Sequence, residues 1–318
     1  MAVNKNCGSL ISHSEQQTDP VSNISNFEFK RILSDNKETK TVAIEGSFKG
    51  KPEPAVFILE KEPFHQENLG QLFHEENIIE KTFNNDIYYQ CQFSPTSVFN
   101  GIKLTFIYPA TEKHITKYEH QVIHIIEETP ELYQTVTLPF LKSEQFSLQW
   151  VFNILEHESE KERIVYEDSD PETGFILCSD IKWDGKSKDS LYLLALPFKR
   201  GIMSLRDLTQ KDLPLLKNIR SKGIKAIQEK YNIPSTQLRI YVHYQPSFYH
   251  FHVHFTNLQH SPPGCGTDRA HLLSTVINNL ELMNNYYQMS NLNFTIRENE
   301  KLFDRYESYG LVKRTATR

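Results

Sequence analysis

A cluster of histidines is the part of the sequence best suited to chemistry. Residues 249–255 read Tyr-His-Phe-His-Val-His-Phe, so histidines alternate with apolar residues. Side chains alternate between the two faces of a β-strand, and a strand here would place His250, His252 and His254 on one face. The apolar residues between them would face the core. A turn-forming Gln-Pro-Ser stretch precedes the cluster and predicts a hairpin that brings a fourth histidine, His243, close to it.

Three interpretations of this cluster compete. The first is a solvated strand that carries histidines by chance. The second is a zinc site, although no nearby carboxylate or cysteine offers a clear third or fourth ligand. The third is nucleophilic catalysis at phosphorus, in which one neutral imidazole attacks a phosphoryl group and its neighbours hold the non-bridging oxygens. Three histidines at a spacing of two, beside a fourth, favour catalysis.

The elements around the cluster indicate two domains. Residues 1–22 are polar and aperiodic, which predicts a flexible tail. Short β-like runs separated by Gly, Pro and Asn predict a β-rich domain over residues 23–110. Helical spacing then predicts a bridging helix over 111–127. The remaining residues, 128–318, should form a second domain with helices beginning near Ser143, Thr209 and Asp268 and with strands near 175–178, 191–196 and 239–256.

Composition excludes several classes of protein. The chain has 318 residues, of which 38% are hydrophobic, enough for a substantial core. It has no apolar run long enough to span a membrane and no secretory signal at its start. The four cysteines are scattered, which argues against a zinc ribbon or disulfide scaffold and favours a reducing compartment. A net charge of -5 gives no basic surface for long nucleic acids, but a small nucleotide ligand remains compatible with it.

Several blocks together resemble one enzyme family. Residues 250–256 follow the histidine-triad pattern His-φ-His-φ-His-φ-φ, with Thr256 in place of the last apolar residue. The surrounding blocks resemble the scavenger mRNA-decapping enzymes, the 7-methylguanosine-cap diphosphatases of the histidine-triad superfamily. They are residues 108–114, 147–155, 200–208, 240–249 and 269–273. The resemblance runs from about residue 85 to about residue 290, and implies an α+β fold with an N-terminal β-rich domain and a C-terminal histidine-triad domain built on an antiparallel sheet.

The resemblance also implies a reaction and the residues that perform it. The enzyme would hydrolyse 7-methylguanosine cap dinucleotides and short capped oligonucleotides left by 3′-to-5′ mRNA decay. His252 would be the nucleophile, and a nucleotidyl-histidine intermediate would release 7-methyl-GMP. Lys182 and Arg269 match phosphate contacts of the family. The other residues matched to the catalytic centre are His250, His254 and His243. No cofactor and no metal are implied.

Recognition of the cap should depend on the positive charge of the methylated guanine. Trp150 matches a stacking tryptophan, and a cation over an indole is attracted by the ring quadrupole. Ile181 occupies the opposing aliphatic position, and Glu160 matches the carboxylate that accepts from the guanine N–H edge. Phe248 stands where relatives commonly have Tyr. The remaining matches to nucleotide contacts are Asp180, Asn85, Tyr88 and Lys117.

The resemblance further implies a homodimer with exchanged N-terminal segments. It implies neither a DNA partner nor a membrane partner. We expect a cytoplasmic location, with the nucleus as a second compartment. Two other functions remain open: a non-catalytic protein that sequesters caps, and a broader histidine-triad nucleotide hydrolase or transferase. The presence of all four histidines argues against pure binding.

Overall fold

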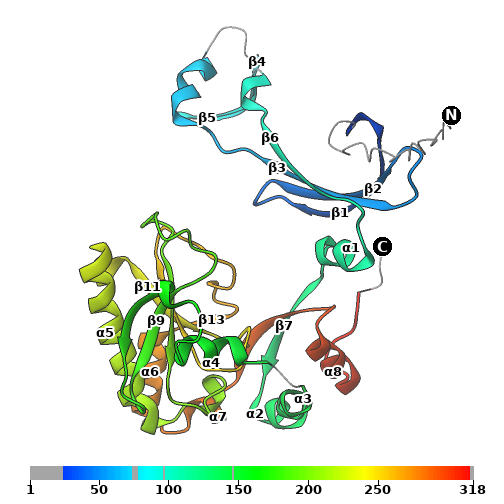
Figure 1. The fold of residues 1–318 in the computed structure, drawn as a ribbon. Helices are drawn as coiled ribbons and strands as arrows, with labels where there is room; N and C mark the ends of the chain where they lie inside the picture. The colour runs from blue at the N-terminus through cyan, green and yellow to red at the C-terminus, as the bar shows by residue number, and fades with distance from the viewer. Residues whose placement is uncertain (1–23, 74–77, 96, 145–146, 316–318) are drawn as a thin grey trace, which may run out of the picture. The chain divides into compact units, whose positions relative to one another are not determined.

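The structure is a computed structural model that describes residues 24–73, 78–95, 97–144 and 147–315. The tail predicted for residues 1–22 lies outside these residues. The chain forms two compact units, Met1–His120 and Gln121–Arg318. Figure 1 labels the helices and strands of both units.

The first unit contains an antiparallel sheet with the strand order β1-β2-β3-β6 and a separate β4–β5 hairpin. A short helix, α1, packs on the sheet because its buried Ile115 contacts Leu33, Ala43 and Val56. The strands are β1 (Phe27–Asn36), β2 (Thr41–Phe48), β3 (Pro54–Lys61), β4 (Ile78–Asn85), β5 (Tyr88–Ser94) and β6 (Ile102–Ile107). The helical segments are η2 (Gln66–Phe73), η3 (Ser97–Phe99) and α1 (Glu112–Tyr118).

The second unit is built on a six-stranded antiparallel sheet in the order β13-β11-β12-β10-β9-β8. A two-stranded sheet, β14–β7, accompanies it. The strands are β7 (Ile123–Glu128), β8 (Ile164–Asp168), β9 (Phe175–Ser179), β10 (Tyr192–Pro197), β11 (Leu238–His243), β12 (Val253–Asn257), β13 (Ala270–Leu272) and β14 (Leu292–Arg297). Mixed helices and antiparallel sheets in both units confirm the α+β class.

The helices of the second unit differ widely in length. The α-helices are α2 (Pro130–Leu132), α3 (Leu138–Ser143), α4 (Gln149–Leu155), α5 (Leu213–Tyr231), α6 (Leu273–Leu282), α7 (Tyr286–Met289) and α8 (Lys301–Tyr309). A π-turn and four 3-10 turns complete the unit: η4 (Tyr133–Thr137), η5 (Lys161–Arg163), η6 (Leu205–Asp207), η7 (Gln210–Asp212) and η8 (Ser235–Gln237). Among the described helices, none is long and apolar enough to cross a membrane.

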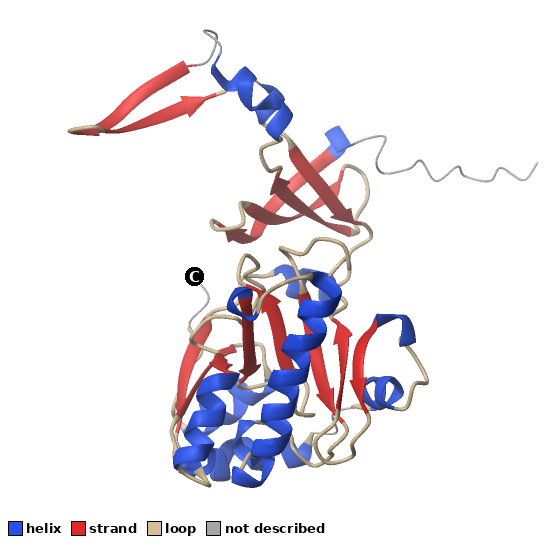
Figure 2. Cartoon of the chain, turned by 90° about the vertical axis from the view of Figure 1, so that its left-hand side faces the viewer, coloured by secondary structure: helices blue, strands red, loops and turns tan. Residues whose placement is uncertain are grey.

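Close packing of α5 shows which face of the six-stranded sheet is buried in the core. Figure 2 shows the long helices lying over the strands of this unit. A Cβ at Gly223 of α5 would come within 2.6 Å of the Phe255 ring, so only glycine lets the helix approach β12 this closely. Phe255 therefore points toward α5. Because side chains alternate along a strand, His254 points to the opposite face of the sheet.

Several predicted element boundaries were wrong. The helix predicted over 111–127 ends at Tyr118, and residues 123–128 instead form β7, because they pair with β14 and bury Ile126 in the core of the second unit. The helix predicted near Asp268 begins at Leu273, because the preceding residues pair with β11 as β13. The helix predicted from Ser143 begins at Gln149, since Ser143 ends α3. Pairing partners far along the chain decide these boundaries.

Candidate active site

The histidine stretch lies partly in a loop and partly in a strand. Strand β12 begins only at Val253, so His250 and His252 precede it and His254 alone lies within it. The prediction of one strand carrying all three histidines was therefore wrong. The predicted inward face is confirmed, since Phe251, Val253 and Phe255 are all buried in the core of the second unit.

Three histidines converge at one point. Strands β11 and β12 pair antiparallel, which places the rings of His243 and His254 with their centroids 4.2 Å apart. The His252 ring centroid lies 4.9 Å from that of His254. One ring nitrogen from each of these three residues lies within 4.8 Å of the other two. His250 is not part of the cluster, because its Nε2–H donates to the Pro197 carbonyl oxygen at 3.0 Å.

A backbone hydrogen bond fixes the tautomer of His252. Its Nδ1 lies 2.8 Å from the carbonyl oxygen of His250, and a carbonyl only accepts, so Nδ1 carries the proton. The lone pair is then on Nε2, which is buried and has no hydrogen-bond partner among the described groups. Burial lowers the pKa of His252 from 6.5 to about 4. At neutral pH the ring is uncharged and its Nε2 lone pair is free, which is what a nucleophilic role requires.

The neighbouring histidines are also uncharged at neutral pH. Burial lowers the pKa of His243 to about 3, and the nearby Arg269 adds to the shift. Burial lowers the pKa of His254 well below its usual value, helped by His252 and His243. The Nδ1 of His254 is 3.1 Å from the hydroxyl oxygen of Tyr192, and its ring stacks on Tyr241 with centroids 5.0 Å apart. The aromatic neighbours hold the ring in place.

A pocket of about 360 Å³ opens onto the three histidines. Lys182 and Arg269 both line it, and neither appears among the ion pairs formed by the described residues. The Arg269 Nε–H donates to the Gln245 carbonyl oxygen at 3.1 Å, which holds the guanidinium without neutralising it. Two positive groups without ion-pair partners beside a nucleophile suit an anionic, phosphate-bearing substrate. Asp180 also lines this pocket, and its carboxylate accepts from the Lys182 backbone N–H at 2.9 Å.

Stacked and edge-on aromatic rings connect Trp150 to His252. The Phe248 ring stacks on His252 with centroids 4.0 Å apart, and Trp150 meets Phe248 edge-on at 4.7 Å. Helix α4 buries Val151, Ile154 and Leu155, whereas Trp150 is 41% exposed. Core packing therefore does not account for Trp150, and its indole is available to a ligand.

Two other predicted cap contacts lie in loops of the same unit. Ile181 follows β9 and is 81% exposed. Glu160 has a left-handed backbone, with φ of 59°, and forms an ion pair with Arg163. The Arg163 Nε–H also donates to the Ser179 carbonyl oxygen at 3.0 Å, which ties Glu160 to the end of β9.

The remaining predicted contacts belong to the first unit. Asn85 and Tyr88 pair across the two-residue turn of the β4–β5 hairpin, and Tyr88 is 70% exposed. Lys117 is in the last turn of α1, with its ammonium 5.1 Å from the centre of the Tyr118 ring. The histidine geometry described above involves the second unit alone.

Sequence reasoning missed a buried ionic network that supports the loop after β11. Arg206 pairs with Glu128 at 2.9 Å, and both side chains are almost completely buried. The Arg206 Nε–H also donates to the Tyr244 hydroxyl at 3.2 Å, and the Gln245 amide donates to Glu128 at 3.3 Å. Gln245 in turn accepts from Arg269 through its carbonyl. No pattern in the sequence marks Arg206 as buried, because the block 200–208 that contains it also carries Arg200 and Asp207.

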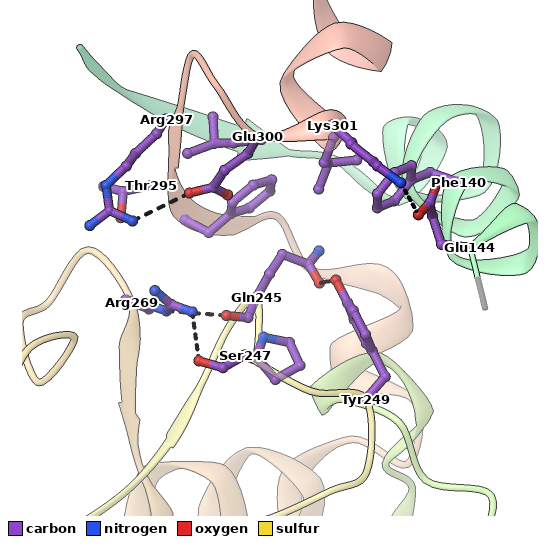
Figure 3. Close-up of a pocket in the computed structure, with 14 residues that line it drawn as sticks. Phe140, Glu144, Gln245, Ser247, Tyr249, Arg269, Thr295, Arg297, Glu300 and Lys301 are labelled. Carbon is purple, nitrogen blue, oxygen red and sulfur yellow. Dashed lines mark hydrogen bonds and ion pairs between the residues drawn. The ribbon is translucent and has the colours of Figure 1, made fainter. Parts of the chain in front are cut away.

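A larger pocket, of about 550 Å³, lies beside the histidine pocket and shares Ser247, Arg269, Thr295 and Arg297 with it. Figure 3 shows Arg269 bonded to Gln245 and Ser247 on one side of this pocket. On the other side Arg297 pairs with Glu300 at 3.4 Å and Lys301 with Glu144 at 2.7 Å. No histidine lines it among the described residues. The smaller pocket therefore holds the chemistry.

The fold and the site define an enzyme of the histidine-triad class, in which an antiparallel sheet and the loop before one of its strands bring uncharged imidazoles together beside positively charged side chains. Two family models match the chain: "Scavenger mRNA decapping enzyme (DcpS) N-terminal" over residues 22–121 and "Scavenger mRNA decapping enzyme C-term binding" over residues 149–270. The chain is 44% identical over 283 residues to the m7GpppX diphosphatase of Sus scrofa, covering 87% of this chain and 84% of the relative.

Relatives from two other species are also similar to this chain. The m7GpppX diphosphatase of Ascaris suum is 44% identical over 285 residues, which is 89% of this chain and 94% of the relative. That of Schizosaccharomyces pombe is 37% identical over 287 residues, which is 87% of this chain and 93% of the relative. The chain therefore belongs to the scavenger mRNA decapping enzyme family.

Proposed function

We propose that this protein is an m7GpppX diphosphatase, which hydrolyses 7-methylguanosine cap dinucleotides and short capped oligonucleotides to release 7-methyl-GMP. The observation that carries the proposal is the unpaired, uncharged Nε2 of His252 beside Lys182 and Arg269. The similarity to m7GpppX diphosphatases over most of the chain supports the identity of the substrate.

The reaction takes place in two displacements. The Nε2 lone pair of His252 attacks the phosphorus attached to 7-methylguanosine, and the bond to the departing diphosphate breaks. The positive charge that develops on the imidazole is stabilised by the Nδ1–H bond to the His250 carbonyl. Water then attacks the same phosphorus, the N–P bond breaks, and the proton of the water leaves to solvent. Lys182 and Arg269 neutralise the phosphate oxygens during both steps.

Recognition of the methylated base falls to the exposed Trp150. Its indole, next to Phe248, offers a π-face to the cationic guanine. Ile181 would cover the other face of the base, and Glu160 and Asp180 would accept from its N–H groups. For Asn85, Tyr88 and Lys117, the nucleotide contacts remain predictions carried by the resemblance.

We also propose a homodimer with exchanged N-terminal segments that is located in the cytoplasm and nucleus. The family resemblance is its support. Size-exclusion chromatography with light scattering tests the dimer, because a mass close to one chain contradicts it. Fractionation of cells that express the protein tests the location.

The central experiment replaces the nucleophile. His252→Asn should abolish release of 7-methyl-GMP from a cap dinucleotide, as followed by chromatography, while binding of the dinucleotide persists. His65→Asn is the matched control, because His65 is an exposed histidine of the first unit, and it should retain full turnover. Rapid quenching of the wild type with denaturant at mildly alkaline pH, where the N–P bond of a nucleotidyl-histidine survives, should trap 7-methyl-GMP on the peptide that contains residue 252.

Three results would contradict the proposal. Hydrolysis by His252→Asn above a small residual rate would exclude the covalent mechanism. Binding of caps by the wild type without any turnover would indicate a protein that sequesters caps. Faster hydrolysis of unmethylated dinucleotides than of methylated ones would indicate a broader nucleotide hydrolase.

A further inference from the structure

We propose that His243, His252 and His254 also form an inhibitory site for one transition-metal ion of the Zn²⁺ type. The ion would occupy the nucleophile and compete with the phosphates of the substrate. The inhibition rests on the proposed function, whereas the binding of the ion does not.

The positions of the three rings suit such an ion. One ring nitrogen from each lies within 4.8 Å of the others. Zn–N bonds of about 2.0–2.1 Å in tetrahedral geometry separate ligand nitrogens by about 3.3 Å, so the rings need to close by up to about 1.5 Å. His252 lies in a loop that precedes β12 and is free of the strand ladder, which allows this adjustment.

Hydrogen bonds on the outer side of the rings already resemble those of metal ligands. A metal-binding histidine typically donates its second ring N–H to an oxygen, which fixes the ring and directs its lone pair at the ion. The Nδ1 of His252 donates in this way to the His250 carbonyl, and the Nδ1 of His254 faces the Tyr192 hydroxyl at 3.1 Å. The Nε2 atoms of both residues are buried and unpaired. Coordination would satisfy two nitrogens that otherwise lack a partner.

The surroundings make the site accessible and its affinity moderate. The three histidines line the same pocket of about 360 Å³, so an ion and a water ligand can enter. Lys182, Arg269 and Arg297 in that pocket repel a divalent cation, while Asp180 and Asp268 attract it. With three imidazoles and no thiolate, the ion should exchange freely. It therefore acts as an inhibitor and not as a resident structural metal.

Direct binding is the first test, on the full chain without a histidine tag. Equilibrium dialysis against Zn²⁺ should give one ion per chain, and Co²⁺ should give the intense visible absorption of a tetrahedral site. His243→Gln and His254→Gln should each lose this absorption. Tyr192→Phe, which removes only the outer hydrogen bond, should weaken binding by about tenfold. His250→Gln is the matched control, because the His250 ring bonds to Pro197 outside the cluster.

Competition is the second test. A non-hydrolysable cap analogue should displace the Co²⁺ signal. In turnover assays Zn²⁺ should raise the apparent KM for the cap dinucleotide without changing kcat, doubling it at about the Kd of the ion, and a chelator should reverse the effect.

Clear outcomes overturn the proposal. Absence of a stoichiometric ion on the wild type refutes the site. Binding that survives His243→Gln and His254→Gln, or that His250→Gln weakens equally, places the ion elsewhere. Circular dichroism of each variant identifies misfolding. If a histidine variant misfolds, the affinity of Tyr192→Phe for the ion tests the site independently. If the ion binds as described but the wild type hydrolyses no cap, the metal site stands and the proposed function fails.

Discussion

Mild acid should destabilise the second unit through its buried histidines. His243 and His252 have pKa values lowered by burial to about 3 and about 4 in the folded protein, compared with 6.5 for an exposed ring. At pH values below 6.5 but above these lowered pKa values, the unfolded chain binds protons that the folded chain does not. Stability therefore falls as the pH falls through 6.5, and the loss continues until the folded-state pKa values are reached.

The size of the effect follows from proton linkage. At about pH 5 an unfolded ring with a pKa of 6.5 is almost fully protonated, which favours unfolding by about 2 kcal/mol relative to pH 7.5. Two such rings give about 4 kcal/mol, a large fraction of the stability of a typical domain. The buried His250 and His254, whose pKa values are also lowered, act in the same direction.

Tryptophan fluorescence during urea unfolding is the appropriate assay. Both tryptophans of the chain, Trp150 and Trp183, lie in the second unit, so the signal reports on that unit alone. The difference in unfolding free energy between pH 7.5 and pH 5 should shrink by about 2 kcal/mol in His243→Asn and in His252→Asn. His65→Asn, in the first unit, should leave it unchanged. Equal pH dependence in the wild type and both buried-site variants would refute the reasoning.

Three further predictions concern individual contacts. Trp150→Ala should weaken 7-methylguanosine ligands by about 2 kcal/mol, roughly thirtyfold, and unmethylated ligands far less in the same titration; equal weakening would make Trp150 a generic stacker. Gly264→Ala should reduce turnover strongly, because its Cβ would lie 2.8 Å from the His243 Nε2, whereas Gly185→Ala, also at positive φ but with nothing within 4 Å, should not. Arg206→Met should lower the unfolding free energy in urea by about 3–5 kcal/mol, because it leaves Glu128 buried and unpaired. Arg200→Met, which removes an exposed pair with Glu156, should lower it by about 1 kcal/mol or less. Similar losses in both variants would mean that the buried network is not stabilising.

Local patterns predicted the inward face of the histidine stretch but not where its strand begins. Alternation places Phe251, Val253 and Phe255 in the core, because burial of apolar side chains dominates there. The start of β12 depends on hydrogen bonds that spacing does not reveal. His250 bonds to the Pro197 carbonyl, 53 positions away, and this keeps it out of the strand and away from the other rings.

The same limit applies to Trp150 and to the ionic network. Helical spacing does not separate Trp150 from the core residues of its helix, yet Trp150 is 41% exposed while Val151, Ile154 and Leu155 fill the core. Only the family resemblance indicated a ligand contact there. Arg206 and Glu128 are 78 positions apart, and each looks like an ordinary surface charge until the fold buries them together. Contacts between residues distant in sequence cannot be predicted from composition or from the spacing of apolar residues.

Burial makes His252 useful and vulnerable for the same reason. A nucleophilic imidazole must be uncharged and have a free nitrogen, and burial favours both because it lowers the pKa of His252 and leaves its Nε2 without a partner. The unpaired Nε2 costs about 1–3 kcal/mol in lost hydration, which the packing of Phe251 and Val253 beside it must offset. The free lone pair of Nε2 can be donated to any electrophile small enough to reach it, whether phosphorus or a metal ion. The selectivity for phosphorus over a metal ion must then come from Lys182 and Arg269, whose charges attract the phosphate and repel the cation.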